Sequence, residues 1–152
     1  MSNWFFKLLI YTHLLSRRKN NMGDAVINKR ERIVLIACKE DKELNSICVN
    51  LLKCCKYRII KVDNGSEAIK QARTMLPDFI LIDMYLPQTD GFTTTKRIRE
   101  FSPFEQTKII FLSELNNNEI RDAAIAVGSN EYLIKPLDFS VLQNTLNKYE
   151  IA

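Results

Sequence analysis

Short apolar runs alternate with segments of helical spacing from Arg32 to the end of the chain. The runs rich in β-branched and apolar residues predict strands over Ile33–Cys38, Ile59–Val62, Phe79–Ile82, Ile109–Leu112 and Tyr132–Ile134. Apolar residues three and four positions apart predict helices between and after these strands, over Leu44–Cys55, Ala68–Leu76, Phe92–Phe101, Ile120–Val127 and Leu142–Tyr149. The third helix has the weakest pattern, because threonines fill much of its first half.

This alternation predicts the fold class. Strands that are apolar throughout, each followed by a helix, are typical of a parallel sheet that helices cover on both faces. We therefore predict an α/β fold with a doubly wound, five-stranded parallel sheet and five helices. Pro77 and Gly128 stand where the second and fourth helices should end, and Asn116–Asn118 offers N-caps for the fourth.

Polar groups directly follow most of the predicted strands. Because the carboxyl ends of parallel strands share one edge, where open α/β sheets place their sites, we expect these groups to converge. They are Lys39, Glu40, Asp41, Asp83, Ser113 and Lys135. Carboxylates, a hydroxyl and an ammonium group at one edge suit a phosphoryl or metal site.

The charge pattern argues against nucleic-acid binding. The chain has 152 residues and a net charge of +4. Residues 1–31 carry six basic and two acidic side chains, so the other 121 residues sum to zero. The folded part therefore offers no basic stripe for nucleic acid.

The four cysteines are expected to be reduced. A zinc site is not expected, since the chain has no C-x-x-C and a single histidine.

We divide the chain into an N-terminal extension, residues 1–31, and a folded domain, residues 32–152. The apolar stretch Trp4–Leu15 is shorter than the ~20 residues of a membrane span. A disordered or loosely docked extension and a peripheral amphipathic helix both remain open, and translation from Met22 is a third alternative. We expect no membrane contact through residues 3–19 and a cytoplasmic protein.

Two segments carry a family resemblance. Ile80–Gly91 (ILIDMYLPQTDG) resembles the phosphoacceptor segment of response-regulator receiver domains such as CheY, and Ala124–Pro136 resembles their fourth-helix to fifth-strand signature. The spacings from Asp83 to Ser113 and to Lys135 match as well. The resemblance covers residues 32–150 and implies a CheY-like, flavodoxin-like fold with strand order 2-1-3-4-5. It further implies a stand-alone, single-domain response regulator of two-component phosphorelay signalling.

The same resemblance implies a role for each site residue. Asp83 would be the phosphoacceptor, and Ser113 the hydroxyl that closes over the phosphate. Lys135 would pair with the phosphate, with a cis bond to Pro136. Tyr132 would be the aromatic switch. A histidine kinase or phosphotransfer protein would act upstream, and a protein target would dock on the fourth helix, fifth strand and fifth helix.

Magnesium is the implied cofactor. Its ligands would be Asp83, the Tyr85 carbonyl and an acid after the first strand, namely Glu40 or also Asp41. Counting back from the first helix places Lys39 at one of the family's two acidic positions, so the pocket loses negative charge and attracts Mg²⁺ less. Two interpretations stay open: a working receiver with weakened metal use, and a pseudo-receiver that binds partners without phosphorylation.

Enzyme folds with a similar strand-end aspartate fit less well. Phosphatases of the dehalogenase type carry a second Asp two residues after the nucleophile, where this chain has Tyr85. A flavodoxin-like cofactor site would need a phosphate-cradling loop after the first strand, and Cys38–Asp41 contains no glycine. We expect a protein that is not an enzyme.

Overall fold

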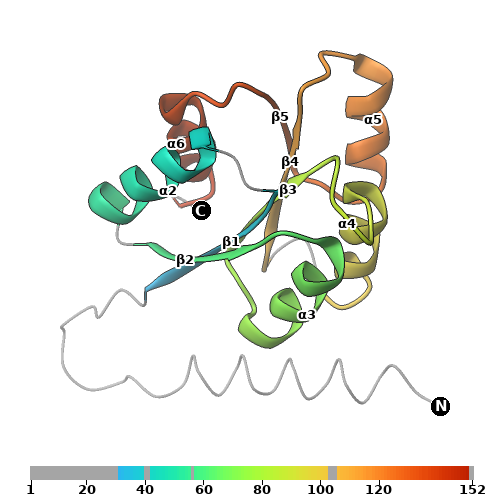
Figure 1. Ribbon diagram of the computed structural model, residues 1–152, viewed down its shortest axis with the longest axis horizontal. Helices are drawn as coiled ribbons and strands as arrows, with labels where there is room; N and C mark the ends of the chain where they lie inside the picture. Colours follow the sequence, from blue (N-terminus) through green and yellow to red (C-terminus); the bar gives the residue numbers. More distant parts are fainter. Residues whose placement is uncertain (1–30, 40–41, 56, 103–105, 151–152) are drawn as a thin grey trace. The chain divides into compact units, whose positions relative to one another are not determined.

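A computed structural model of the chain describes residues 31–39, 42–55, 57–102 and 106–150. Within them, five parallel strands form one sheet in the order β2-β1-β3-β4-β5 (Figure 1). The strands are β1 (Arg32–Ala37), β2 (Tyr57–Val62), β3 (Phe79–Asp83), β4 (Lys108–Ser113) and β5 (Glu131–Ile134). The predicted fold class and strand order are confirmed. The predicted extension over residues 1–31 lies almost wholly outside the described residues.

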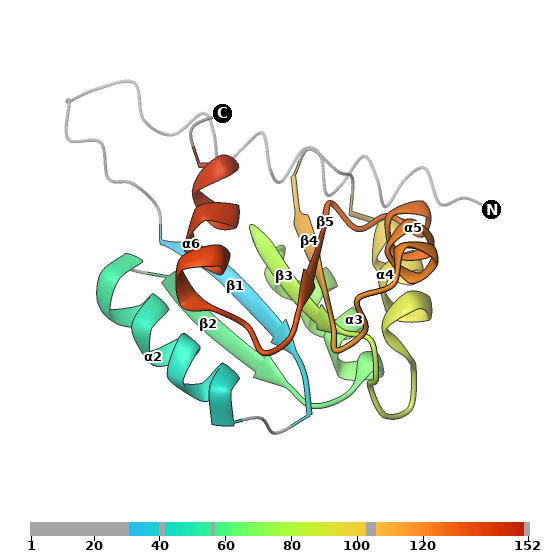
Figure 2. The ribbon, with the colours of Figure 1, turned by 90° about the horizontal axis from the view of Figure 1, so that it is seen from above.

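Five helices of the described part cover both faces of the sheet (Figure 2). They are α2 (Lys42–Cys55), α3 (Gly65–Met75), α4 (Gly91–Arg99), α5 (Asn118–Ala126) and α6 (Phe139–Lys148). Apolar residues of α2 and α6 pack on one face, and those of α3 and α4 pack on the other. A smaller cluster joins α5 to β4 and β5 through Ala124, Phe111 and Tyr132. None of the described helices is long and apolar enough to cross a membrane.

The central strand β3 shows why the strands read as unbroken apolar runs. Phe79 and Leu81 enter the core beneath α2 and α6, while Ile80 and Ile82 enter the core beneath α3 and α4. Successive side chains of a strand point to opposite faces, so a sheet covered twice needs apolar residues at every position. The strand remains buried up to its last residue, Asp83.

The element ends differ from the predicted ones by a few residues. Strand β2 begins at Tyr57, two residues early, because Tyr57 is buried and Arg58 is exposed at this sheet edge. Helix α3 ends before Pro77, with Leu76 in a left-handed conformation at φ 48°. Asn117 caps α5, accepting hydrogen bonds from the N–H groups of Glu119 and Ile120. Strand β1 ends at Ala37 rather than Cys38, a difference that matters at the site.

Candidate functional site

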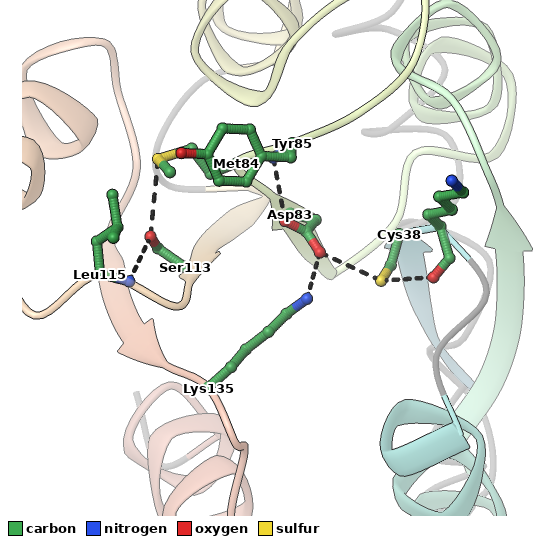
Figure 3. A network of polar contacts seen from close by, with 8 residues as sticks. Cys38, Asp83, Met84, Tyr85, Ser113, Leu115 and Lys135 are labelled. Carbon is green, nitrogen blue, oxygen red and sulfur yellow. Dashed lines mark hydrogen bonds and ion pairs between the residues drawn. The ribbon is translucent and has the colours of Figure 1, made fainter.

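Asp83 is the last residue of the central strand and the centre of the site (Figure 3). β1 lies on one side of β3 and β4 on the other, with Ala37 paired to Ile82 and Asp83 paired to Leu112. The residue is only 7% exposed. Its Oδ1 accepts a hydrogen bond from the backbone N–H of Tyr85 at 3.1 Å, so the chain turns back over the carboxylate immediately after the strand.

Lys135 brings a positive charge to this carboxylate. It follows β5 directly, and its backbone N–H donates to the Ser113 carbonyl at 2.8 Å. The ammonium forms an ion pair and hydrogen bond with Asp83 Oδ2, and the two side chains are 13% and 9% exposed. The bond to Pro136 is cis, as the resemblance implies. Two charges that are largely withdrawn from water interact more strongly than a surface pair.

The loop after Asp83 depends on Gly91. A Cβ atom at this position would lie 2.5 Å from the Asp83 carbonyl oxygen and 2.9 Å from the Met84 Cα. The Gly91 N–H also donates to the Met84 carbonyl at 3.0 Å. Asp90, one residue earlier, caps α4 by accepting from the Thr93 N–H at 3.0 Å. That hydrogen bond is the main reason why the pKa of Asp90 lies below its ordinary value.

Ser113 and Tyr132 meet through one residue, Leu115. The Leu115 N–H donates to Ser113 Oγ at 3.1 Å, and the Leu115 carbonyl accepts from the Tyr132 hydroxyl at 2.6 Å. The Ser113 hydroxyl lies 3.6 Å from the Met84 sulfur. Tyr132 is 5% exposed and stacks on Phe111. The hydroxyl and the aromatic ring are therefore connected by two consecutive hydrogen bonds.

Cys38 is a site residue that the sequence reasoning did not assign to the site. Its Sγ lies 3.4 Å from Asp83 Oδ2 and 2.9 Å from the Lys39 carbonyl oxygen (Figure 3). The residue is 5% exposed. The available signal was its position at the end of an apolar run, but the same signal also fits a buried core cysteine.

The family model for the response regulator receiver domain matches residues 34–147. The chain belongs to this family. Over 118 residues it is 30% identical to the transcriptional regulatory protein ZraR of Klebsiella oxytoca. The matched region covers 78% of this chain but only 26% of ZraR. The chain is thus similar to about a quarter of that protein's length.

Two solved structures extend the likeness to three dimensions. The receiver domain of the sensor histidine kinase PA1611 from Pseudomonas aeruginosa has a TM-score of 0.68 and 26% identity, with 80% of this chain and 99% of that one covered. It holds a magnesium ion in its active-site cleft. The chemotaxis response regulator CheY4 of Vibrio cholerae has a TM-score of 0.69 and 25% identity, covering 78% and 98% of the two chains. This chain is a receiver domain of two-component signalling.

The receiver's described residues fit Mg²⁺ poorly. Mg²⁺ prefers hard oxygen ligands, and the described part offers the Asp83 carboxylate and the Tyr85 carbonyl. The residue directly after β1, Cys38, places a sulfur 3.4 Å from Asp83 Oδ2, and Asp83 with Lys135 is a neutral pair. No group of three or more metal-binding side chains occurs among the residues that the structure describes. Glu40 and Asp41, the predicted acidic ligands, lie outside them.

Lys39 is exposed, and its carbonyl is the group that contacts the Cys38 thiol. β1 ends at Ala37, so the two residues directly after this strand are Cys38 and Lys39. The count back from the first helix placed the family's acidic positions one residue later, on Lys39 and Glu40. The weaker attraction of Mg²⁺ that Lys39 implies stays a prediction.

Proposed function

We propose that this receiver accepts a phosphoryl group on Asp83 and signals through binding that depends on this modification. The observation that supports the proposal is the buried ion pair of Asp83 with Lys135 at the carboxyl edge of the sheet. A carboxylate that is to attack a phosphoryl group must be held in place and have a cation beside it. This receiver acts as an acceptor and a binding module, and not as an enzyme on a separate substrate.

The transfer would form a mixed anhydride on Asp83. A carboxylate oxygen bonds to phosphorus while the bond from phosphorus to the donor breaks, and its electron pair leaves with the donor. In two-component signalling the donor is a phosphohistidine on a kinase or phosphotransfer protein. Each pair of unit negative charges at 4 Å would repel by about 4 kcal/mol at an effective dielectric of ~20. The Lys135 ammonium offsets part of that repulsion and can then pair with a phosphate oxygen.

Phosphorylation would reach the surface through Leu115. If Ser113 turns toward the phosphate, its Oγ can no longer accept from the Leu115 N–H at the present geometry. Leu115 then moves, and its carbonyl shifts the bond to the Tyr132 hydroxyl. New contacts stabilise this rearrangement only in the phosphorylated state, so the modification shifts the population between two states.

The target would dock on the surface formed by α5, β5 and α6, next to Tyr132. Ile125 on α5 and Val141 on α6 are large apolar residues that are 44% and 49% exposed. The Arg121 guanidinium lies 5.1 Å from the centre of the Tyr132 ring. Movement of this ring would therefore also change the charge arrangement that a partner meets.

The test is phosphorylation of the full chain by a small phosphodonor, with and without Mg²⁺. We expect one added phosphoryl group by intact mass, lost on treatment with hydroxylamine, which cleaves acyl phosphates. Asp83→Asn should abolish the addition. Asp90→Asn is the matched control, since it removes a neighbouring carboxylate, keeps a capping side chain, and should leave phosphorylation in place.

A pseudo-receiver is the second candidate. The observation that favours it is the Cys38 thiol beside Asp83, where the resemblance implies an acid. Such a protein would bind its partner equally well before and after incubation with phosphodonor. Absence of any added phosphoryl group at high donor and Mg²⁺ concentration would contradict the first proposal and leave this one.

A further inference from the structure

The residue that β1 places against the acceptor is a cysteine. β1 and β3 pair through Ala37 and Ile82, so the next residues, Cys38 and Asp83, lie at the same level of the sheet. The Cys38 N–H donates to the Val62 carbonyl at 3.0 Å, which fixes its backbone against the neighbouring strand. Its sulfur lies 3.4 Å from Asp83 Oδ2. The last strand pair and this backbone hydrogen bond therefore fix the position of Cys38 beside Asp83.

We propose that Cys38 sets the metal affinity of the acceptor pocket: a neutral, soft sulfur stands beside Asp83 and makes the pocket a weak site for Mg²⁺. The inference rests on the proposed function, in which Asp83 is the phosphoacceptor. Cys38 is a specificity-determining residue in this proposal. Lys39, which the sequence singled out, has a lesser role.

The donor type at Cys38 disfavours a hard cation. Mg²⁺ takes oxygen ligands in near-octahedral geometry, whereas thiols suit softer metals. The Cys38 thiol has a single proton, and both the Asp83 carboxylate and the Lys39 carbonyl lie within reach of it. In either arrangement the sulfur fills the space beside Oδ2 without contributing an oxygen.

The net charge of the pocket also disfavours Mg²⁺ binding. Asp83 and Lys135 carry opposite charges and form one ion pair. A carboxylate at position 38 would give these three side chains a net charge of −1 in a place that is only 5% exposed. Lys39 is exposed, so its charge acts through water and salt, which weaken it. Position 38 should therefore affect a divalent cation more than position 39.

The experiment is a Mg²⁺ titration of the full chain by calorimetry, for the natural protein and for Cys38→Asp, Cys38→Ser and Lys39→Asp. The amide signal of Tyr85 in ¹H–¹⁵N spectra reports whether the ion binds at the pocket. We expect Cys38→Asp to tighten Mg²⁺ binding by about tenfold or more, the scale on which changes around a metal site act. Cys38→Ser should tighten it less, since it supplies an oxygen without charge.

Lys39→Asp is the matched control, because it changes the formal charge by −2 one residue away, against −1 for Cys38→Asp. A smaller gain for Lys39→Asp than for Cys38→Asp supports the inference. An equal or larger gain overturns it, since charge alone would then explain the effect. Unchanged affinity in Cys38→Asp also overturns it. If Cys38→Asp does not fold, the near-isosteric Cys38→Ser decides, and affinity equal to that of the natural protein overturns the inference.

The phosphorylation assay separates this inference from the proposed function. Tighter Mg²⁺ binding in Cys38→Asp, together with no phosphoryl transfer to Asp83 in any variant, would overturn the proposed function but not the inference. Phosphoryl transfer to Asp83 with unchanged Mg²⁺ affinity in Cys38→Asp would do the reverse.

Discussion

At the amino edge of the sheet one polar side chain, Arg99, bonds mostly to backbone carbonyls, whereas at the carboxyl edge Asp83 Oδ2 is contacted by two other side chains. Arg99 shows the first arrangement: it donates to the carbonyls of Gly128 at 2.7 Å, Ser102 at 3.1 Å and Thr107 at 2.9 Å. It also donates to Asn130 Oδ1, which in turn accepts from the Ile109 N–H. This one side chain joins the ends of α4 and α5 to the starts of β4 and β5.

The contacts of Asp83 Oδ2 at the carboxyl edge are of a different kind. Lys135 and Cys38 both contact Asp83 Oδ2 through side-chain atoms. A side chain can exchange such a partner by rotating about its own bonds, while a backbone carbonyl moves only with its whole element. The comparison teaches that the contacts of Arg99 tie elements of the fold together, whereas the side-chain contacts of Asp83 Oδ2 are adjustable, and a phosphoryl group would have to displace them.

The variant with the largest expected effect on stability removes the contacts of Arg99 at the amino edge. Arg99→Met keeps the apolar stem but removes all donors to the three carbonyls, so we expect the free energy of unfolding to fall by about 3 kcal/mol. Urea unfolding at neutral pH measures it. Arg97→Met is the control, because Arg97 is exposed on the same helix and should cost about 0.5 kcal/mol or less. Equal losses in the two variants would contradict the assigned role of Arg99.

The core of the fold could be predicted because its signals are local. Runs such as Phe79–Ile82 and the spacing of Leu44, Ile47 and Leu51 report burial directly. Helix α4 was the weakest prediction, and its threonines explain why. Thr94 and Thr95 are fully buried, and the Thr94 hydroxyl donates to the Thr89 carbonyl, so polar residues occupy a face that pattern reading expects to be apolar.

Site residues that lie at strand ends or at the family's spacings could be predicted. Contacts that depend on the strand register could not. Asp83 was assigned as the phosphoacceptor and Lys135 as the partner of its phosphate, and the structure brings the two side chains together across 52 positions. Cys38 meets Asp83 across 45 positions, through a strand register that one sequence does not reveal. For the same reason nothing in the sequence singles out Arg99, whose partners lie up to 31 positions away.

The next largest effect on stability is expected from the loss of a helix-capping contact at the carboxyl edge. Asp90→Ala removes the side chain that caps α4 and should lower the free energy of unfolding by about 1 kcal/mol at neutral pH. Because hydrogen bonding to Thr93 holds the pKa of Asp90 below its ordinary value, the contribution is fully present above that ordinary value. It is lost as the pH falls through the ordinary pKa and then through the lowered one.

Asp90→Asn is the control for this pH dependence, since asparagine caps helices without titrating in this range. Urea unfolding at several pH values down to about 3 should show the natural protein losing stability relative to Asp90→Asn. A constant difference across that range would show that the charge of Asp90 contributes nothing to the cap.

The smallest expected effect is a gain, and it lies in the loop next to Asp83. Gln88 has φ 66°, and the Thr89 N–H donates to the Pro87 carbonyl across it at 2.7 Å. A three-residue turn with positive φ is the strained form for a residue with a Cβ atom. Glycine adopts this conformation without that penalty but loses more chain entropy on folding, so Gln88→Gly should add about 0.5–1 kcal/mol to the free energy of unfolding.

Gln88→Ala, which keeps the Cβ atom, should add nothing. The gain would sharpen the comparison, because it would place backbone strain beside Asp83, in a loop whose Pro87 carbonyl also accepts from the Gly65 N–H at the start of α3. A loss of stability in both Gln88→Gly and Gln88→Ala would instead mean that the Gln88 side chain holds this loop, and a side chain would then fix the loop next to Asp83 as Arg99 fixes the amino edge.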